Sequence, residues 1–91
     1  MNNRTRKELA SIILKVHEER SKLEDLKDDV ESIKDDEESK YENLPEGLQE
    51  SEMGQTLAEV YEGLEAVVDM MDMIVDDLNE VANSLEEVVN M

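Results

Sequence analysis

The side chains that could do acid–base or metal chemistry are of few kinds, since the 91 residues include one His, no Cys and 26 Asp and Glu. His17 has no second His or Cys with which to form a zinc site. Asp69, Asp72, Asp76 and Asp77 lack the glycine and the loop spacing of a calcium-binding EF-hand. Neither a Gly-rich phosphate loop nor a Glu-x-x-His metal motif occurs. We therefore expect no enzyme activity, no catalytic or cofactor-binding residue and no metal.

The charge of the chain is large and unevenly distributed. The formal net charge is −17, and residues 1–40 contain all nine Lys and Arg together with twelve acids. Residues 41–91 contain fourteen acids and no Lys or Arg. Nucleic acid and anionic lipid repel such a chain at long range, so we expect a basic protein surface as the partner, without direct binding to nucleic acid or membrane.

The pattern of apolar residues excludes a membrane span. No apolar run approaches the roughly 18 residues that a spanning helix needs, and the first residues lack the apolar centre of a signal peptide. We expect a soluble protein of the cytoplasm, or of the host cytoplasm if the chain is encoded by a phage.

One break divides the chain into two arms of nearly equal length. Pro45 disfavours helical geometry in the residue before it, and Gly47 tolerates the backbone angles of a turn. A capping box at Thr5 and Glu8 is typical of a helix start. We predict one all-α domain over 1–91, with a helix over about 5–40, a turn over about 41–50 and a helix over about 51–90. A short connection favours an antiparallel hairpin, here a two-helix coiled coil.

Apolar residues recur in heptad phase along both arms. The first arm has one row with interruptions at Glu19, Glu37 and Lys40, namely Leu9, Ile12, Val16, Leu23, Leu26, Val30, Ile33 and Leu44. The second arm has an uninterrupted row, namely Met53, Leu57, Val60, Leu64, Val67, Met71, Ile74, Leu78, Val81, Leu85 and Val88. Such a strict repeat is typical of helices that supercoil around each other, so we assign this row to the contact between the arms.

Further apolar residues beside that row indicate a second contact. With the turn centred near residue 46, His17 to Arg20 lie opposite Asp72 to Val75, close to three methionines. Methionines either fill an irregular core or form an adaptable docking patch. Because a stripe three residues wide in each heptad usually needs two neighbours, we predict a homodimeric four-helix bundle. Its self-association or docking seam consists of Tyr61, Val68, Met70, Met71, Met73, Val75, Ala82 and Val89.

The acids of the second arm form ridges along the outer side of the predicted helix. The candidate partner-binding ridge consists of Glu59, Glu62, Glu65, Asp69, Asp72, Asp76, Asp77 and Glu80. A side-by-side dimer of the whole hairpin has a net charge about every 1.7 Å of length, which is close to the charge spacing of duplex DNA. One hypothesis is an inhibitor that imitates nucleic acid in the basic groove of another protein. The alternative is a structural or adaptor coiled coil that binds a partner helix through its apolar seam, with acids that only solubilise it.

The turn has a sequence resemblance that bears on the choice. The run Tyr41-Glu-Asn-Leu-Pro-Glu-Gly-Leu-Gln-Glu-Ser-Glu52, with the helix after it, resembles small acidic helical-hairpin proteins of Gram-positive bacteria and their phages. Those proteins share an "ENLPE-x-LQ-x-SE" turn, and the likeness covers about half of the chain. The resemblance implies a helical hairpin without catalytic residues. It also favours a phage-type inhibitor of a nuclease or defence protein.

Overall fold

The structure, a computed structural model that describes all residues 1–91, consists of two α-helices and no strand. Helix α1 spans Asn3–Glu42 and helix α2 spans Glu52–Val89. The predicted all-α class is confirmed, and Pro45 and Gly47 both lie in the segment 43–51 between the helices, as expected.

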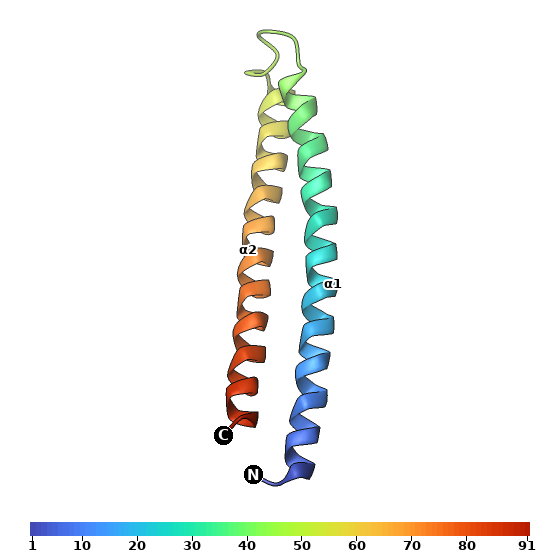
Figure 1. Cartoon of the computed structure of the whole chain (residues 1–91). Coiled ribbons are helices and arrows are strands. Elements are labelled where there is room, and N and C mark those ends of the chain that lie inside the picture. The colour runs from blue at the N-terminus through green and yellow to red at the C-terminus, as the bar shows by residue number, and fades with distance from the viewer. The chain divides into compact units, whose positions relative to one another are not determined.

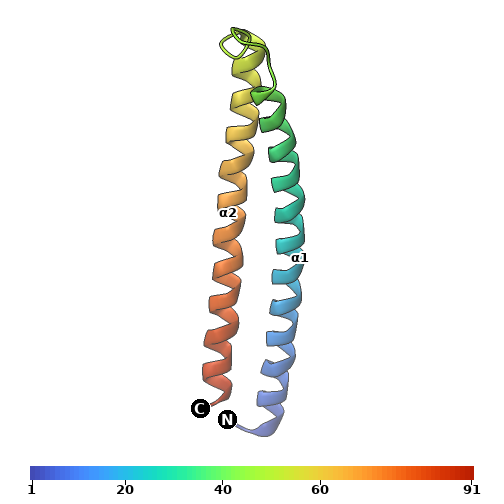
Figure 2. The same cartoon turned by 45° about the horizontal axis from the view of Figure 1, so that its top comes forward.

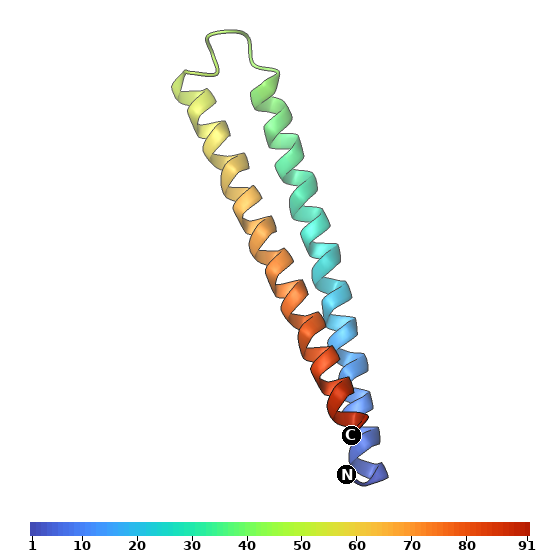
Figure 3. The same ribbon diagram turned by 60° about the vertical axis from the view of Figure 1, so that its left-hand side comes forward.

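The chain is divided into two compact units. The terminal unit comprises Met1–Asp25 and Met71–Met91, and the turn unit comprises Leu26–Met70. Within each unit, a segment of α1 lies beside a segment of α2 and runs in the opposite direction, as three views show (Figure 1, Figure 2 and Figure 3). The N- and C-termini lie at the same end of the terminal unit (Figure 1).

Helix α1 begins earlier than the capping box predicted. The side-chain Oδ1 of Asn2 accepts a hydrogen bond of 2.8 Å from the backbone N–H of Thr5, so Asn2 caps the helix. Glu8 instead pairs with Arg4, one helical turn before it, at 3.4 Å. Thr5 is therefore inside the helix, because Asn2 precedes it and Asn caps a helix at least as well as Thr does.

The connection between the helices is a series of turns that folds back onto the start of α2. Gly47 has a φ of 89°, which L-residues other than glycine rarely adopt. Ser51 caps α2, since its hydroxyl accepts a hydrogen bond of 3.2 Å from the backbone N–H of Gly54. Gly54 itself is buried, and a Cβ there would collide with the backbone carbonyls of Leu48 and Gln49. Of the two glycines inside α2, this is the one that allows a close backbone approach.

The contact between the two helices, which we call the seam, follows heptad spacing on both. Its residues on α2 are Leu57, Tyr61, Leu64, Val68, Met71, Val75, Leu78, Ala82, Leu85 and Val89, all buried or half-buried. Its residues on α1 are Arg6, Leu9, Ile13, Val16, Arg20, Leu23, Lys27, Val30, Lys34, Glu37 and Tyr41, again buried or half-buried. Leu44, in the connection just after α1, is half-buried as well. Only Ile13, Val68, Val75 and Ala82 are buried as core residues, so the interior of the chain is small.

The seam differs from the prediction on both helices. On α2, Val68, Val75 and Ala82 were expected in a second stripe, but they are the most buried apolar side chains of that helix. On α1, the prediction joined Ile12 to the seam, where the structure has Ile13. Three apolar residues in each heptad of α2 can form either of two seams, and the sequence alone does not say which pair of rows faces α1.

Candidate protein-binding surfaces

One row of apolar residues on α2 is left outside the seam. These residues recur at every seventh position and are 39% to 55% exposed; we call them the apolar stripe: Met53, Val60, Val67, Ile74, Val81 and Val88. They belong to the row that the sequence assigned to the contact between the arms. The structure corrects that assignment for these six residues. The other five residues of the predicted row do line the seam, namely Leu57, Leu64, Met71, Leu78 and Leu85.

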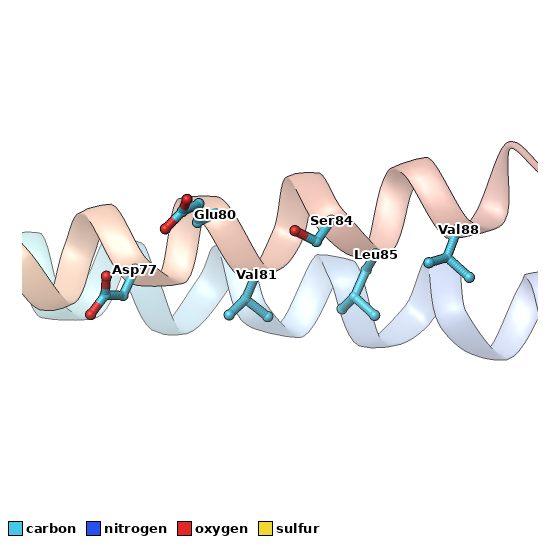
Figure 4. A pocket seen from close by; sticks show the side chains of 6 residues that line it. All are labelled: Asp77, Glu80, Val81, Ser84, Leu85 and Val88. Atoms are coloured by element: carbon cyan, nitrogen blue, oxygen red, sulfur yellow. The ribbon is translucent and has the colours of Figure 1, made fainter.

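In the terminal unit, the apolar stripe borders a shallow groove of about 480 Å³. Figure 4 shows that Val81, Leu85 and Val88 project from one side of α2, with Asp77 one helical turn before Val81. Glu80 and Ser84 complete the lining. The groove is therefore an apolar strip with a carboxylate at its border, which suits a partner that is apolar at its centre and cationic at its edge.

The two sides of the terminal unit differ in polarity. On one side, His17 Nε2 lies 3.8 Å from Glu86 Oε1, and Arg20 Nη1 donates a hydrogen bond of 2.7 Å to Asn79 Oδ1. In an antiparallel pair of helices, the residues directly C-terminal to the seam residues of α1 lie on the same side as those directly C-terminal to the seam residues of α2. The residues directly N-terminal to the seam residues of both helices lie together on the other side. The exposed side chain of Ile12 therefore shares the other side with Val81 of the apolar stripe.

The turn unit repeats this pattern. Leu26 and Ile33 are exposed on α1, and the stripe residues of this unit are exposed on α2. Lys34 is a half-buried seam residue of this unit. Its Nζ contacts Asp35 Oδ1 at 2.8 Å and Glu38 Oε2 at 3.6 Å. In each unit the exposed aliphatic residues of the two helices thus lie on one and the same side of the seam.

The predicted docking seam is mostly not accessible to a partner. Six of its eight residues line the seam between α1 and α2, namely Tyr61, Val68, Met71, Val75, Ala82 and Val89. Met70 and Met73 are exposed, at 56% and 66%. The prediction is therefore wrong for the six seam residues, because the chain itself covers them.

The predicted register between the helices is also wrong. The contacts of His17 and Arg20 are Glu86 and Asn79, not the segment from Asp72 to Val75. The reason is that the segment 43–51 and the first residues of α2 lie beyond the point where the helices meet. Tyr41, near the end of α1, packs against Tyr61, with ring centroids 5.5 Å apart and the ring planes tilted by 54°. The methionines consequently do not face the interruption at His17 to Arg20.

The acidic ridge is exposed as the sequence suggested. All of its members are exposed: Glu59, Glu62, Glu65, Asp69, Asp72, Asp76, Asp77 and Glu80. Among them, Glu59, Asp69, Asp76, Asp77 and Glu80 form no salt bridge. Because α2 contains no Lys or Arg, these carboxylates have no cation of their own helix to pair with.

Sequence reasoning missed a row of cations in the seam. Arg6, Arg20, Lys27 and Lys34 are half-buried on α1, at positions that share the heptad phase of Ile13. Searching for apolar residues alone hides such a row, although the spacing of seven or fourteen residues between these cations could have revealed it. Their long apolar stems suit the seam, and the charged ends of Arg20 and Lys34 contact polar groups at its edge.

Three groups of the turn unit, namely Lys34, Lys40 and Tyr61, have pKa values above their ordinary ones. The hydrogen bond from Lys40 to Glu37 raises the pKa of the Lys40 ammonium above 10.5. The hydrogen bond from Lys34 to Asp35 raises the pKa of that ammonium above 10.5, and nearby Glu38 and Glu65 add to the effect. Burial raises the pKa of the Tyr61 phenol above 10.0, and the neighbouring Glu62 adds to it.

We expect the turn unit to lose stability at alkaline pH. All three folded pKa values exceed the unfolded ones, so the stabilisation is complete below about pH 10 and is lost as the pH rises through the folded values. In Tyr41→Phe, Tyr61 is the only tyrosine, and its phenolate absorbance should titrate above 10.0 in the native state and return to 10.0 in denaturant. A native midpoint at or below the denatured one contradicts the burial of Tyr61.

We expect Asn79→Ala to destabilise the chain by about 1 to 2 kcal/mol, because the substitution removes the acceptor of a charged donor. Arg20 Nε is already buried without a partner. The double variant Arg20→Met/Asn79→Ala should therefore be more stable than Asn79→Ala alone. Urea unfolding of the four proteins measures this coupling, with the exposed Asn83→Ala as control. Additive effects would contradict a functional contact between the two side chains.

Three further findings concern metal ions, membranes and known proteins. No group of three or more His, Cys, Asp or Glu is placed to hold a metal ion. Neither helix has a stretch long and apolar enough to cross a membrane. No protein-family model, curated protein or solved structure matches the sequence.

Proposed function

We propose that this chain is a non-catalytic protein-binding module that binds a basic surface of another protein through the acidic ridge of α2. The observation that supports this proposal most is that α2 contains no Lys or Arg and that five carboxylates of its ridge form no salt bridge. These five are Glu59, Asp69, Asp76, Asp77 and Glu80, and all of them are exposed. A ridge of exposed carboxylates, most of them outside any salt bridge, attracts cationic surfaces and accelerates association with them.

The proposed partner is a nuclease, a defence protein or another nucleic-acid-processing protein. Such proteins present basic grooves that bind the phosphate backbone, and an acidic helix can occupy them in its place. The resemblance of the turn to small acidic proteins of Gram-positive bacteria and their phages supports an inhibitor that acts in the host cytoplasm.

Displacement of nucleic acid tests this function. A labelled duplex bound to a non-specific nuclease is titrated with the chain at several salt concentrations, and a panel of such nucleases serves as targets. We expect release that weakens steeply as salt rises, because ion pairs between the ridge and the groove are screened. Displacement that is insensitive to salt, or none across the panel, contradicts the proposal.

A matched pair of variants locates the binding surface. The ridge variant combines Glu59→Gln, Asp69→Asn, Asp76→Asn, Asp77→Asn and Glu80→Gln. The control variant changes the net charge equally on exposed residues of α1, with Glu18→Gln, Asp25→Asn, Asp28→Asn, Asp29→Asn and Glu31→Gln. We expect the ridge variant to lose at least about ten-fold more affinity than the control, since close charge pairs govern such interfaces. Equal losses would assign the effect to net charge alone.

We also propose that two chains associate into a homodimeric four-helix bundle. The exposed apolar side of each unit supports this association, because six aliphatic residues of α2 recur on one row and remain outside the seam. The alternative use of the same side is an adaptor function, in which a helix of another protein takes the place of the second copy. Sedimentation equilibrium distinguishes the two, since only the homodimer forms from the isolated chain.

A further inference from the structure

We propose that the apolar side of the terminal unit is covered by the terminal unit of a second copy, with α1 of each protomer lying along α2 of the other. This arrangement rests on the proposed homodimer and specifies which helices meet. The occupant follows from the chemistry of the groove and from the positions of the charges beside it.

The apolar centre of this side comes from both helices. Ile12 of α1 and Val81 and Val88 of α2 are exposed, between 40% and 46%, and Leu85 lies between the latter two in the groove. Aliphatic side chains that line a groove are stabilised by a partner that removes them from water. A second copy presents the same kind of surface, so a two-fold arrangement buries both at once.

The charges beside this centre differ between the helices. On α1, Lys15 and Lys22 are exposed on the side of Ile12, at spacings of three and ten residues from it. On α2, the border of the groove is acidic, with Asp77 and Glu80 and no cation. A contact between α1 of one copy and α2 of the other therefore brings opposite charges together. A contact between the two α2 helices brings only carboxylates together, which repel each other.

The register places the opposite charges at matching levels. Arg20 contacts Asn79, so Lys22, two residues further along α1, lies at the level of Asp77 and Glu80 on α2. In a dimer whose two-fold axis runs parallel to the helices of the terminal unit, this level is the same in both copies. Lys22 of one copy then faces Asp77 of the other. Lys22 Nζ also donates to Glu19 Oε1 at 3.3 Å, which holds the ammonium on this side of α1.

The same geometry predicts which units meet. With α1 against α2 of the second copy, neighbouring helices are antiparallel only if terminal unit packs on terminal unit. With α1 against α1 and α2 against α2, antiparallel packing instead brings the terminal unit onto the turn unit of the second copy. The distribution of charge selects the first arrangement.

Disulfide trapping between single-cysteine variants tests the arrangement, because the native chain has no Cys. Lys15→Cys and Ser84→Cys place one thiol each on exposed positions of α1 and α2 on the apolar side. We expect a mixture of the two variants to give a covalent dimer on mild oxidation, and neither variant alone to do so. Ser11→Cys mixed with Asn83→Cys, both exposed and away from this side, is the control that should give none.

The possible results separate the arrangement from the dimer itself. If Ser84→Cys cross-links on its own, the arrangement is overturned and the homodimer stands. The same conclusion follows if the mixture does not cross-link although sedimentation shows a dimer. A monomer in sedimentation equilibrium at micromolar concentration overturns both, and it leaves the acidic ridge as a separate question. Val81→Glu should abolish the dimer, whereas Asn83→Glu should not.

A charge exchange supplies a second readout that does not depend on cysteine. Lys22→Glu should raise the dissociation constant of the dimer by about 3- to 10-fold, and Lys22→Glu/Asp77→Lys should restore it to within about two-fold. Lys22→Glu/Asp28→Lys restores the same net charge at an exposed residue of α1 and should not rescue the dimer. Equal rescue by both would contradict the pairing of Lys22 with Asp77.

Discussion

Val75→Asp unfolds the terminal unit, whereas Ile74→Asp leaves the free energy of unfolding within about 1 kcal/mol of the original. Both substitutions introduce the same residue, with the same charge and helix propensity, at adjacent positions of α2. Val75 is 7% exposed and Ile74 is 48% exposed, so only the first forces a carboxylate into the seam. Burial of an unpaired carboxylate costs several kcal/mol, which is more than so small a core can offset.

Circular dichroism with urea unfolding measures this difference at concentrations where sedimentation shows a monomer. At higher concentration, Ile74→Asp should fail to dimerise while its helix content persists. If Ile74→Asp unfolded the chain and Val75→Asp did not, the seam of α2 would be the row that the sequence originally suggested. The pair of variants thus tests the correction of the seam directly.

Gly54→Ala and Gly63→Ala should change stability in opposite directions. A Cβ on Gly54 would collide with the carbonyls of Leu48 and Gln49, and these are backbone atoms that cannot move without opening the connection. A Cβ on Gly63 meets nothing within 4 Å. Alanine therefore costs about 2 to 3 kcal/mol at the first position, and adds about 1 kcal/mol at the second through its higher helix propensity.

The same pair of variants separates packing from propensity. Both glycines lie within α2, so propensity alone predicts stabilisation at both. Thermal unfolding of dilute samples gives the two changes. Stabilisation by Gly54→Ala would show that the connection does not rest on the start of α2.

The sequence was sufficient for the helices and the connection, because local signals determine them. Pro45 disfavours helical geometry in the residue before it, Gly47 tolerates the backbone angles of a turn, and an unbroken heptad row is typical of a long helix. The seam was not predictable in the same way. Val68 and Val67 are identical side chains at neighbouring positions, and only the packing of α1 decides that the first is buried and the second is exposed.

The candidate surfaces were predictable in part for the same reason. Exposure of the ridge follows from charge, since carboxylates such as Asp69 and Asp76 remain in water unless they are paired. The docking seam depended on the choice between two apolar rows, and the wrong choice placed Ala82 at a surface although it is 0% exposed. Half-buried cations such as Arg20 were missed because arginine is usually read as a surface residue, while its apolar stem also suits a seam.

The confinement of every Lys and Arg to α1 determines how this protein can be probed chemically. A protease specific for Lys and Arg cuts α1 and leaves everything after Lys40 in one piece. Amine-reactive cross-linkers attach through lysine side chains to α1 alone and leave α2 unlabelled. Carbodiimide coupling joins carboxylates of either helix to the amines of a bound protein, so it reaches the ridge of α2, which amine-reactive reagents leave untouched.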